Sequence, residues 1–141
     1  LQGGPGCGSP RPEGRFGWIK RATEEYQLLL LDQRGCGLSS PITHQTLLNV
    51  SENAEEQARY LSFFRADNIV KDCELIREKL LGKGTWTVLG QSYGGFCLMH
   101  YLSVAPSGLK AALFAGGLPS IVHNNPDEIY RLTFKKLLEH N

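Results

Sequence analysis

The sequence predicts an α/β fold in which a mostly parallel sheet is flanked by helices. Short, continuously apolar runs alternate with longer runs whose apolar residues recur every three or four positions, as strands and helices do. Strands that alternate with helices form βαβ units, which give parallel sheets with right-handed crossovers. In such a fold we expect the functional residues at the carboxyl ends of the strands.

The composition fits one globular unit. Of the 141 residues, 41% are hydrophobic and 21% are charged. The 15 Lys and Arg residues are balanced by 14 Asp and Glu residues without a block of either sign, so we expect neither a nucleic-acid partner nor a charged membrane partner. No apolar run approaches the roughly 20 residues that cross a bilayer, and we expect no membrane span or targeting signal. No pattern in the sequence sets an oligomeric state.

The cysteines predict no metal site, because they show neither a CxxC pair nor a ligand spacing with histidine. Cys73 and Cys97 fall on apolar faces, where a cysteine behaves as a small buried hydrophobe. We expect reduced thiols and a cytoplasmic location. The four cysteines are Cys7, Cys36, Cys73 and Cys97.

The chain begins with a loop, residues 1–12, that is rich in glycine and proline. A helix is predicted over Gly14–Glu25. The run Tyr26–Asp32, YQLLLLD, is short and apolar and ends at DQRGCG, which predicts a central strand buried on both faces. Residues 40–65 are polar and irregular, with a helical piece expected around Glu55–Phe64.

Residues 65–81 predict an amphipathic helix, capped by Asp67 and closed by Gly82. Its apolar residues recur at helical spacing: Ile69, Cys73, Ile76 and Leu80.

Three further elements and a tail helix follow. Residues 85–90, TWTVLG, predict a second buried strand, and residues 94–104 predict a helix that is apolar on nearly all sides. Residues 110–117, KAALFAGG, predict a third strand. Residues 125–141 predict another amphipathic helix.

A strand-to-helix junction carries the clearest chemical signal. Gly90-Gln91-Ser92-Tyr93-Gly94 satisfies G-x-S-x-G, the pattern of a nucleophile elbow, in which a sharp turn exposes the serine hydroxyl above the sheet. Glycines two positions before and after the serine avoid clashes with neighbouring backbone, and the helix directs its N–H groups at the reacting centre. The pattern predicts Ser92 as a nucleophile; the alternative is a tight corner whose serine caps the helix.

An acyl-transfer serine also needs N–H donors for the oxyanion. The residue after the nucleophile, Tyr93, supplies one, and the glycine-rich loop QGGPG supplies the second from Gly3 or Gly4. Two alternatives for this loop are a plain flexible loop and a phosphate-binding loop, although Ser9 stands where the latter needs lysine.

Asp32 and Arg34 end the predicted strand with a carboxylate beside a guanidinium. We interpret both as structural residues that join the loops at the sheet edge by charge-assisted hydrogen bonds, with a direct catalytic role as the alternative.

Five motifs in this order resemble the prolyl aminopeptidases, or proline iminopeptidases, of the α/β-hydrolase fold: LQGGPGCGSPRP, LLLDQRGCGLSSP, FRADNIVKDCELIREKLLG, WTVLGQSYGGFCLMHYLSVAP and AGGLP. The resemblance is greatest to the larger branch, whose first motif reads QGGPG rather than HGGPG. It implies a serine exopeptidase that releases N-terminal proline from peptides without a metal or organic cofactor. By motif, the residues carry over as a nucleophile (Ser92), an oxyanion hole (Tyr93, Gly3, Gly4) and a structural signature (Asp32, Arg34).

The partners of the serine are not expected in this chain. A triad on this fold follows the order Ser, acid, His. His100 is eight residues past the serine on the same predicted helix, about 12 Å away at a rise of 1.5 Å per residue, which is too far for a hydrogen bond. Asp127 or Glu128 with His140 is the sole ordered pair, and these residues fall on one short predicted helix.

The resemblance implies that the catalytic Asp and His follow a helical cap inserted after the third strand. We therefore expect residues 1–119 to form a partial α/β-hydrolase core and residues 120–141 to begin the cap, in a fragment that is nearly inactive alone.

Two other functions stay open. One is a different α/β hydrolase, such as an esterase or a broader aminopeptidase, since the elbow is shared while specificity comes from the cap. The other is a non-catalytic binding protein with a hydrolase-like fold. The intact elbow and QGGPG loop favour the enzyme, and the reading frame after Asn141 distinguishes the two.

Overall fold

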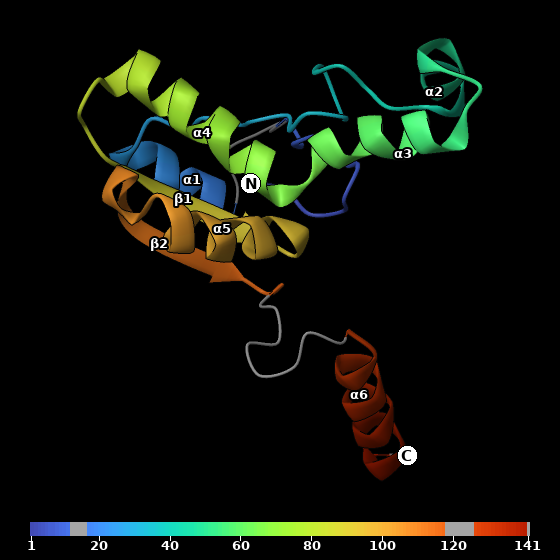
Figure 1. Cartoon of the computed structure of the whole chain (residues 1–141). Coiled ribbons are helices and arrows are strands. Elements are labelled where there is room, and N and C mark those ends of the chain that lie inside the picture. The colour runs from blue at the N-terminus through green and yellow to red at the C-terminus, as the bar shows by residue number, and fades with distance from the viewer. Residues whose placement is uncertain (12–16, 118–125, 141) are drawn as a thin grey trace.

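The core of the structure is a βαβ unit. The strands β1 (Trp86–Gln91) and β2 (Leu109–Ala115) pair in parallel, and α5 (Tyr93–Val104) connects them, as Figure 1 shows. Both strands and the helix between them agree with the prediction to within one or two residues at most ends. The computed structural model describes three stretches of the chain: residues 1–11, 17–117 and 126–140.

The helix α4 (Ala66–Leu81) packs on α5, and the hydrophobic core lies between these helices and β1. Cys73 and Cys97 are 2% and 0% exposed, which confirms that they are small buried hydrophobes. The fully enclosed core side chains also include Leu98 and Tyr101. The predicted amphipathic helix is therefore confirmed, and its residues Ile69 and Cys73 pack in the core, whereas Leu80 is 62% exposed.

The C-terminal end of α4 agrees with the prediction, and the N-terminal end does not. Asp67 is not the capping residue, because Arg65 occupies the N-cap position and no side chain caps this end. Asp67 lies in the first turn instead, where its negative charge faces the positive end of the helix dipole. Gly82 closes the helix as predicted, with φ of 58° and its N–H donated to the carbonyl of Glu78.

The stretch predicted to be irregular contains a helix that the apolar pattern did not show. The helix α2 (His44–Val50) begins at a reciprocal polar cap: the Thr43 hydroxyl accepts from the N–H of Thr46, and the Thr46 hydroxyl accepts from the N–H of Thr43. The expected helical piece is present as α3 (Ala54–Leu61), continued by the 3-10 turn η1 (Ser62–Phe64).

The central strand predicted at Tyr26–Asp32 is wrong for this structure, because no strand of the described residues pairs with that run. Tyr26 and Leu29 are 58% and 54% exposed rather than buried. A strand exists only as part of a hydrogen-bonded ladder, so an apolar run without a neighbour cannot form one. The N-terminal loop contacts the end of this run, since the Ser9 hydroxyl donates to the carbonyl of Leu31 at 2.6 Å.

The first residue lies beside β1 as a strand residue would. The Leu1 amino group donates to the carbonyl of Leu89 at 2.6 Å, and the N–H of Gln91 donates to the carbonyl of Leu1 at 3.0 Å. These two bonds have the pattern of a parallel bridge opposite Gly90. They place the following QGGPG loop directly at the end of β1.

Three further elements complete the described part of the chain. The described part of the helix predicted from Gly14 is α1 (Gly17–Glu25), and η2 (Pro106–Gly108) is a short turn before β2. The C-terminal helix α6 (Pro126–His140) is confirmed and lies apart from the rest in Figure 1. The expected boundary between residues 119 and 120 lies outside the described residues. Within the three described stretches, no helix has both the length and the apolar character needed to cross a membrane.

The turn from β1 into α5 is held in an unfavourable backbone conformation. Ser92 has φ of 52° and ψ of −121°, and it is the only residue other than glycine with positive φ in the described part of the chain. Gly82 adopts nearly the same dihedrals, 58° and −116°. Ser92 therefore occupies a conformation that the chain elsewhere gives to glycine.

The glycines of this turn are required by close backbone packing. A Cβ on Gly90 would lie 2.5 Å from the carbonyl oxygen of Gly94, and a Cβ on Gly94 would overlap the carbonyl oxygen of Leu1. Neither position tolerates a side chain without movement of the backbone.

A buried polar network fixes the other end of the unit. The indole N–H of Trp86 donates to the Tyr101 hydroxyl at 3.1 Å, and that hydroxyl donates to the carboxylate of Glu74. Arg77 holds the same carboxylate through two bonds of 2.9 and 2.8 Å and donates to the carbonyl of Gly84 at 2.7 Å. The network joins β1, α5 and α4.

The strain at Ser92 predicts an order of stability between two substitutions that both remove the hydroxyl. We expect Ser92→Gly to be more stable than Ser92→Ala by about 1 kcal/mol, because glycine adopts this conformation without a steric penalty. Urea denaturation of both variants measures the difference. Equal midpoints, or a more stable alanine variant, would show that the turn is not strained.

The buried network predicts a cost for removing one hydroxyl. Tyr101→Phe leaves the Glu74 carboxylate and the Trp86 indole without this partner, and we expect it to lower the free energy of unfolding by about 1 to 2 kcal/mol. The matched control is Tyr26→Phe, which removes a hydroxyl from a ring that is 58% exposed. Chemical denaturation should separate the two variants, and a Tyr101→Phe curve that overlays the control would contradict the network's role.

Candidate active site

Three loops meet at the carboxyl end of β1. A Cβ on Gly3 would lie 2.7 Å from the Ser92 Cβ and 3.3 Å from its Oγ, so the QGGPG loop passes directly beside the serine. The N–H of Ser92 donates to the carbonyl of Ala115 at the end of β2. Gly117, with φ of 74°, approaches so closely that a Cβ there would overlap the Ser92 carbonyl. The serine is therefore enclosed on its backbone side by glycine.

The Ser92 side chain is exposed and is not used to cap α5, because it forms no capping hydrogen bond. Among the described residues its hydroxyl has no hydrogen-bond partner of any kind. The helix-capping alternative for this serine therefore has no support in the geometry. An exposed, unpaired hydroxyl at a strained turn is instead the arrangement that a nucleophile elbow requires.

Free N–H donors lie on two sides of the serine. Tyr93 is the first residue of α5, so its N–H has no acceptor within the helix. The N–H groups of Gly3 and Gly4 likewise have no hydrogen-bond acceptor within the described stretches. The structure brings Gly3 against Ser92, and Gly4 follows it with φ of 119°, a value that favours glycine.

The Tyr93 side chain lies along the first turns of α5. Its ring stacks on that of Phe96 with centroids 5.9 Å apart and planes 10° from parallel. Burial, reinforced by Cys97, raises the pKa of Tyr93 to about 12. Tyr93 is therefore a neutral phenol at ordinary pH.

Asp32 joins two loops. Its carboxylate accepts from the N–H of Ser9 at 2.7 Å, from the N–H of Leu38 at 2.8 Å, and from the guanidinium of Arg11 at 2.7 Å. The N–H bonds from Leu38 and Ser9 hold the pKa of Asp32 below its usual value. The carboxylate stays ionised and fixes the N-terminal loop against the 33–38 turn.

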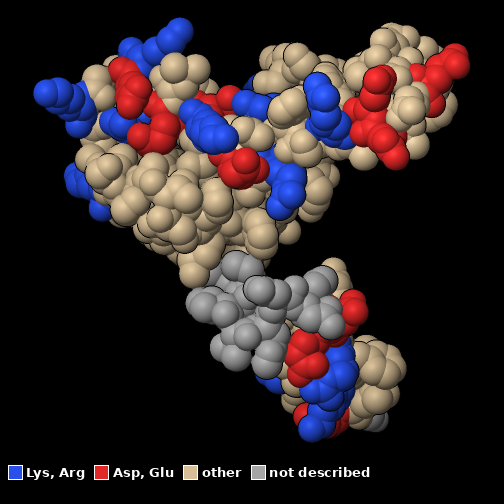
Figure 2. Space-filling model, viewed as in Figure 1, with Lys and Arg blue, Asp and Glu red and all other residues tan. Residues whose placement is uncertain are grey.

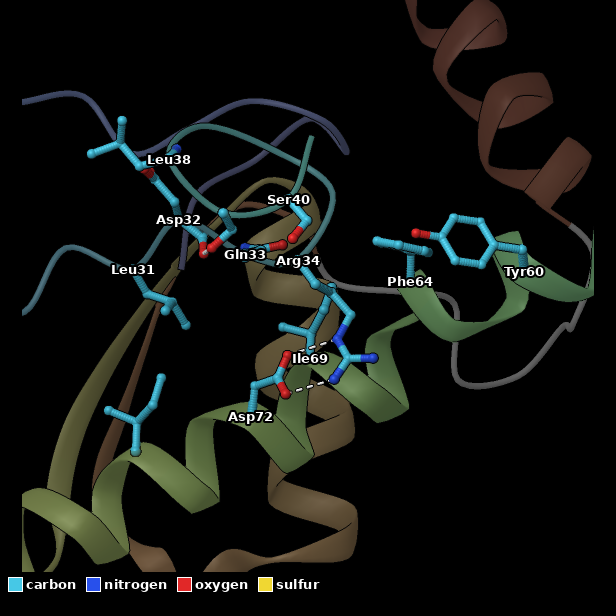
Figure 3. Close-up of a pocket in the computed structure, with 12 residues that line it drawn as sticks. Leu31, Asp32, Gln33, Arg34, Leu38, Ser40, Tyr60, Phe64, Ile69 and Asp72 are labelled. Carbon is cyan, nitrogen blue, oxygen red and sulfur yellow. Dashed lines mark hydrogen bonds and ion pairs between the residues drawn. The ribbon is translucent and has the colours of Figure 1, made fainter. Parts of the chain in front are cut away.

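Arg34 joins the same turn to α4, as Figure 3 shows. It makes two bonds of 2.6 Å to the carboxylate of Asp72 and one of 2.7 Å to the carbonyl of Phe63. With Asp32 it lines a cavity of about 490 Å³. Neither Asp32 nor Arg34 has a hydrogen bond to Ser92, and both instead hold the loops that surround it.

Two contributors to this site were missed from the sequence. The side-chain amide of Gln33 donates to the carbonyl of Gln2 at 2.9 Å, which anchors the QGGPG loop. Gly117 is the other, since its backbone lies so close to the Ser92 carbonyl that a Cβ there would overlap it. The glycine pair that ends KAALFAGG was an available signal for Gly117, whereas no pattern distinguishes Gln33.

No metal centre is formed by the part of the chain that the structure describes, where no three His, Cys, Asp or Glu residues are grouped to hold an ion. The four cysteines are free; three are buried, and Cys7 is exposed. Burial raises the pKa of the Cys73 thiol to about 12. The buried thiols are therefore protonated and act as apolar packing.

The chain matches known proteins along nearly its whole length. The alpha/beta hydrolase fold family matches residues 1–140. The chain is 50% identical over 141 residues to a proline iminopeptidase of Aeromonas sobria, covering 100% of this chain and 32% of that protein. It is 42% identical over 135 residues to a proline iminopeptidase of Aspergillus aculeatus, covering 92% of this chain and 30% of that protein.

A proline iminopeptidase of Neisseria gonorrhoeae is 32% identical over 117 residues, covering 82% of this chain and 31% of that protein. The chain thus spans about a third of the length of the curated relatives it matches. Since the family match extends over nearly every residue, including both strands and the elbow, the chain belongs to the alpha/beta hydrolase fold family.

Proposed function

We propose that this chain is the part of a prolyl aminopeptidase that carries the nucleophile and the oxyanion hole. The observation that supports the proposal most strongly is Ser92 itself, an exposed hydroxyl on a strained turn with free N–H groups on both sides. The relatives at 50% and 42% identity are both proline iminopeptidases, which supports N-terminal proline as the residue released from a peptide substrate.

The geometry suggests a role for each group in the proposed reaction. Ser92 Oγ attacks the carbonyl carbon after the N-terminal proline while a base accepts the serine proton. The resulting oxyanion binds the N–H of Tyr93 and that of Gly3 or Gly4. The same proton passes to the departing amine, and water then hydrolyses the acyl-enzyme. No metal or organic cofactor takes part in this proposal.

The base and its orienting acid are proposed to lie outside this chain. Ser92 has no histidine partner among the described residues, and a serine without a base keeps an ordinary hydroxyl and loses most of its rate. We therefore propose that the 141-residue chain is nearly inactive by itself.

The remaining residues have supporting roles in the proposal. Asp32 and Arg34 act as structural residues, which their bonds to Ser9, Leu38 and Asp72 support. Residues 1–119 form a partial hydrolase core and residues 120–141 begin the cap. The free thiols suit a reducing compartment, so a cytoplasmic location belongs to the same proposal.

A serine-directed probe tests the nucleophile. The longest reading frame that contains this sequence should react covalently with a fluorophosphonate, and Ser92→Ala should abolish the labelling, because the probe needs a nucleophilic serine in an oxyanion hole. The matched control is Ser103→Ala on the same helix, whose exposed hydroxyl bonds only the carbonyl of Met99. Labelling that survives in Ser92→Ala would refute the assignment.

A substrate panel tests the specificity. We expect prolyl-naphthylamide to be hydrolysed with a kcat/KM at least about tenfold above that of alanyl-naphthylamide, since a pocket shaped for proline loses contacts with the smaller residue. A p-nitrophenyl ester serves as the comparison for a general esterase. If the ester is hydrolysed and the prolyl amide is not, the protein is a different α/β hydrolase and the prolyl aminopeptidase proposal is wrong.

A further inference from the structure

A second cavity is lined by Tyr93, the residue that follows Ser92. It has a volume of about 760 Å³ and lies where the N-terminal ends of α4 and α5 face each other, next to η1. We call it the α4–α5 groove, defined by Phe63, Arg65, Tyr93 and Phe96. Tyr93 follows Ser92 in the chain, and its side chain lines the groove.

One wall of the groove is aromatic and partly open. Phe63 and Phe96 are 50% and 44% exposed, and Tyr93 stacks on Phe96. Exposed, ordered aromatic rings offer a large apolar contact at little entropic cost.

The groove also has a positive charge that no salt bridge among the described residues neutralises. Arg65 is exposed, and its guanidinium has no carboxylate partner within the described stretches. Arg65 lines the groove together with Asp67, whose carboxylate carries the opposite charge. The neighbouring cation Lys71 is already paired with Asp67 at 3.8 Å. The helix α5 contributes no charged side chain, and Figure 2 shows its face as an uncharged region below the charged surface of α4.

We propose that the α4–α5 groove binds the leaving part of the peptide substrate, the residues that follow the scissile bond. An apolar or aromatic side chain of that part packs on Tyr93, Phe96 and Phe63, and the terminal carboxylate of a short peptide pairs with Arg65. The inference rests on the proposed function, because Tyr93 is what connects the groove to Ser92. If the groove binds the leaving part, the enzyme should prefer short peptides whose second residue is apolar.

The test measures binding of a leaving group without turnover. The probe is the dipeptide Phe-Ala, titrated by calorimetry into the Ser92→Ala form of the longest reading frame that contains this sequence. Phe96→Ala in that background should weaken binding about tenfold, because it removes half of the stacked wall. Leu102→Ala on the same helix, at a residue 36% exposed and outside the groove, should leave the affinity unchanged.

A second pair of ligands tests the charge. Arg65→Gln should weaken Phe-Ala severalfold but leave the amidated dipeptide, which has no terminal carboxylate, unaffected. Lys83→Gln, beyond the C-terminal end of α4, is the control. Failure of Phe-Ala to bind, or equal affinities for Phe96→Ala and Leu102→Ala, would overturn the proposal. Failure of the proposed function is a separate result, seen as absent prolyl-naphthylamide hydrolysis in the unsubstituted protein.

Discussion

The site depends on one constraint, the approach of backbone to backbone around Ser92. The carbonyl of Leu1, the QGGPG loop and Gly117 all come within contact distance of the 90–94 turn, and each does so where a Cβ would collide. Because these contacts are between backbones, no side chain separates the QGGPG loop from the 90–94 turn. The close packing also holds the serine in dihedrals that only a rigid surround can maintain.

A polar network holds the opposite end of the βαβ unit together. The bonds from Trp86 to Tyr101 and from Tyr101 to Glu74 tie the start of β1 and the last turn of α5 to α4. Arg77, 7% exposed, completes the charge balance and satisfies carbonyls of the 82–84 turn. With the far end fixed by directional bonds, β1 and α5 can meet at the sharp angle that the elbow needs.

The elements that were predictable from sequence are those whose signal is local. The strands β1 and β2 and the helices α4 and α5 combine apolar pattern with glycine boundaries, and each forms as expected. Tyr26–Asp32 shows the limit, because an apolar run reports burial while a strand also needs a hydrogen-bonded neighbour. The helix α2 depends on a two-threonine cap rather than on periodicity, and α4 begins at Arg65 without any side-chain cap, so Asp67 was not needed there.

The same distinction applies to the site. The G-x-S-x-G spacing specifies the backbone of the turn, so the position of Ser92 and the free N–H of Tyr93 could be predicted from five residues. The direction of the Tyr93 ring could not, since the ring stacks on Phe96 in the first turn of α5 and lines a groove whose other side belongs to the start of α4. On the proposed function this residue acts twice: its backbone stabilises the oxyanion, and its side chain forms part of the leaving-group groove. Because an N–H is present with almost any side chain, substitution at this position can alter peptide preference while the oxyanion donor stays in place.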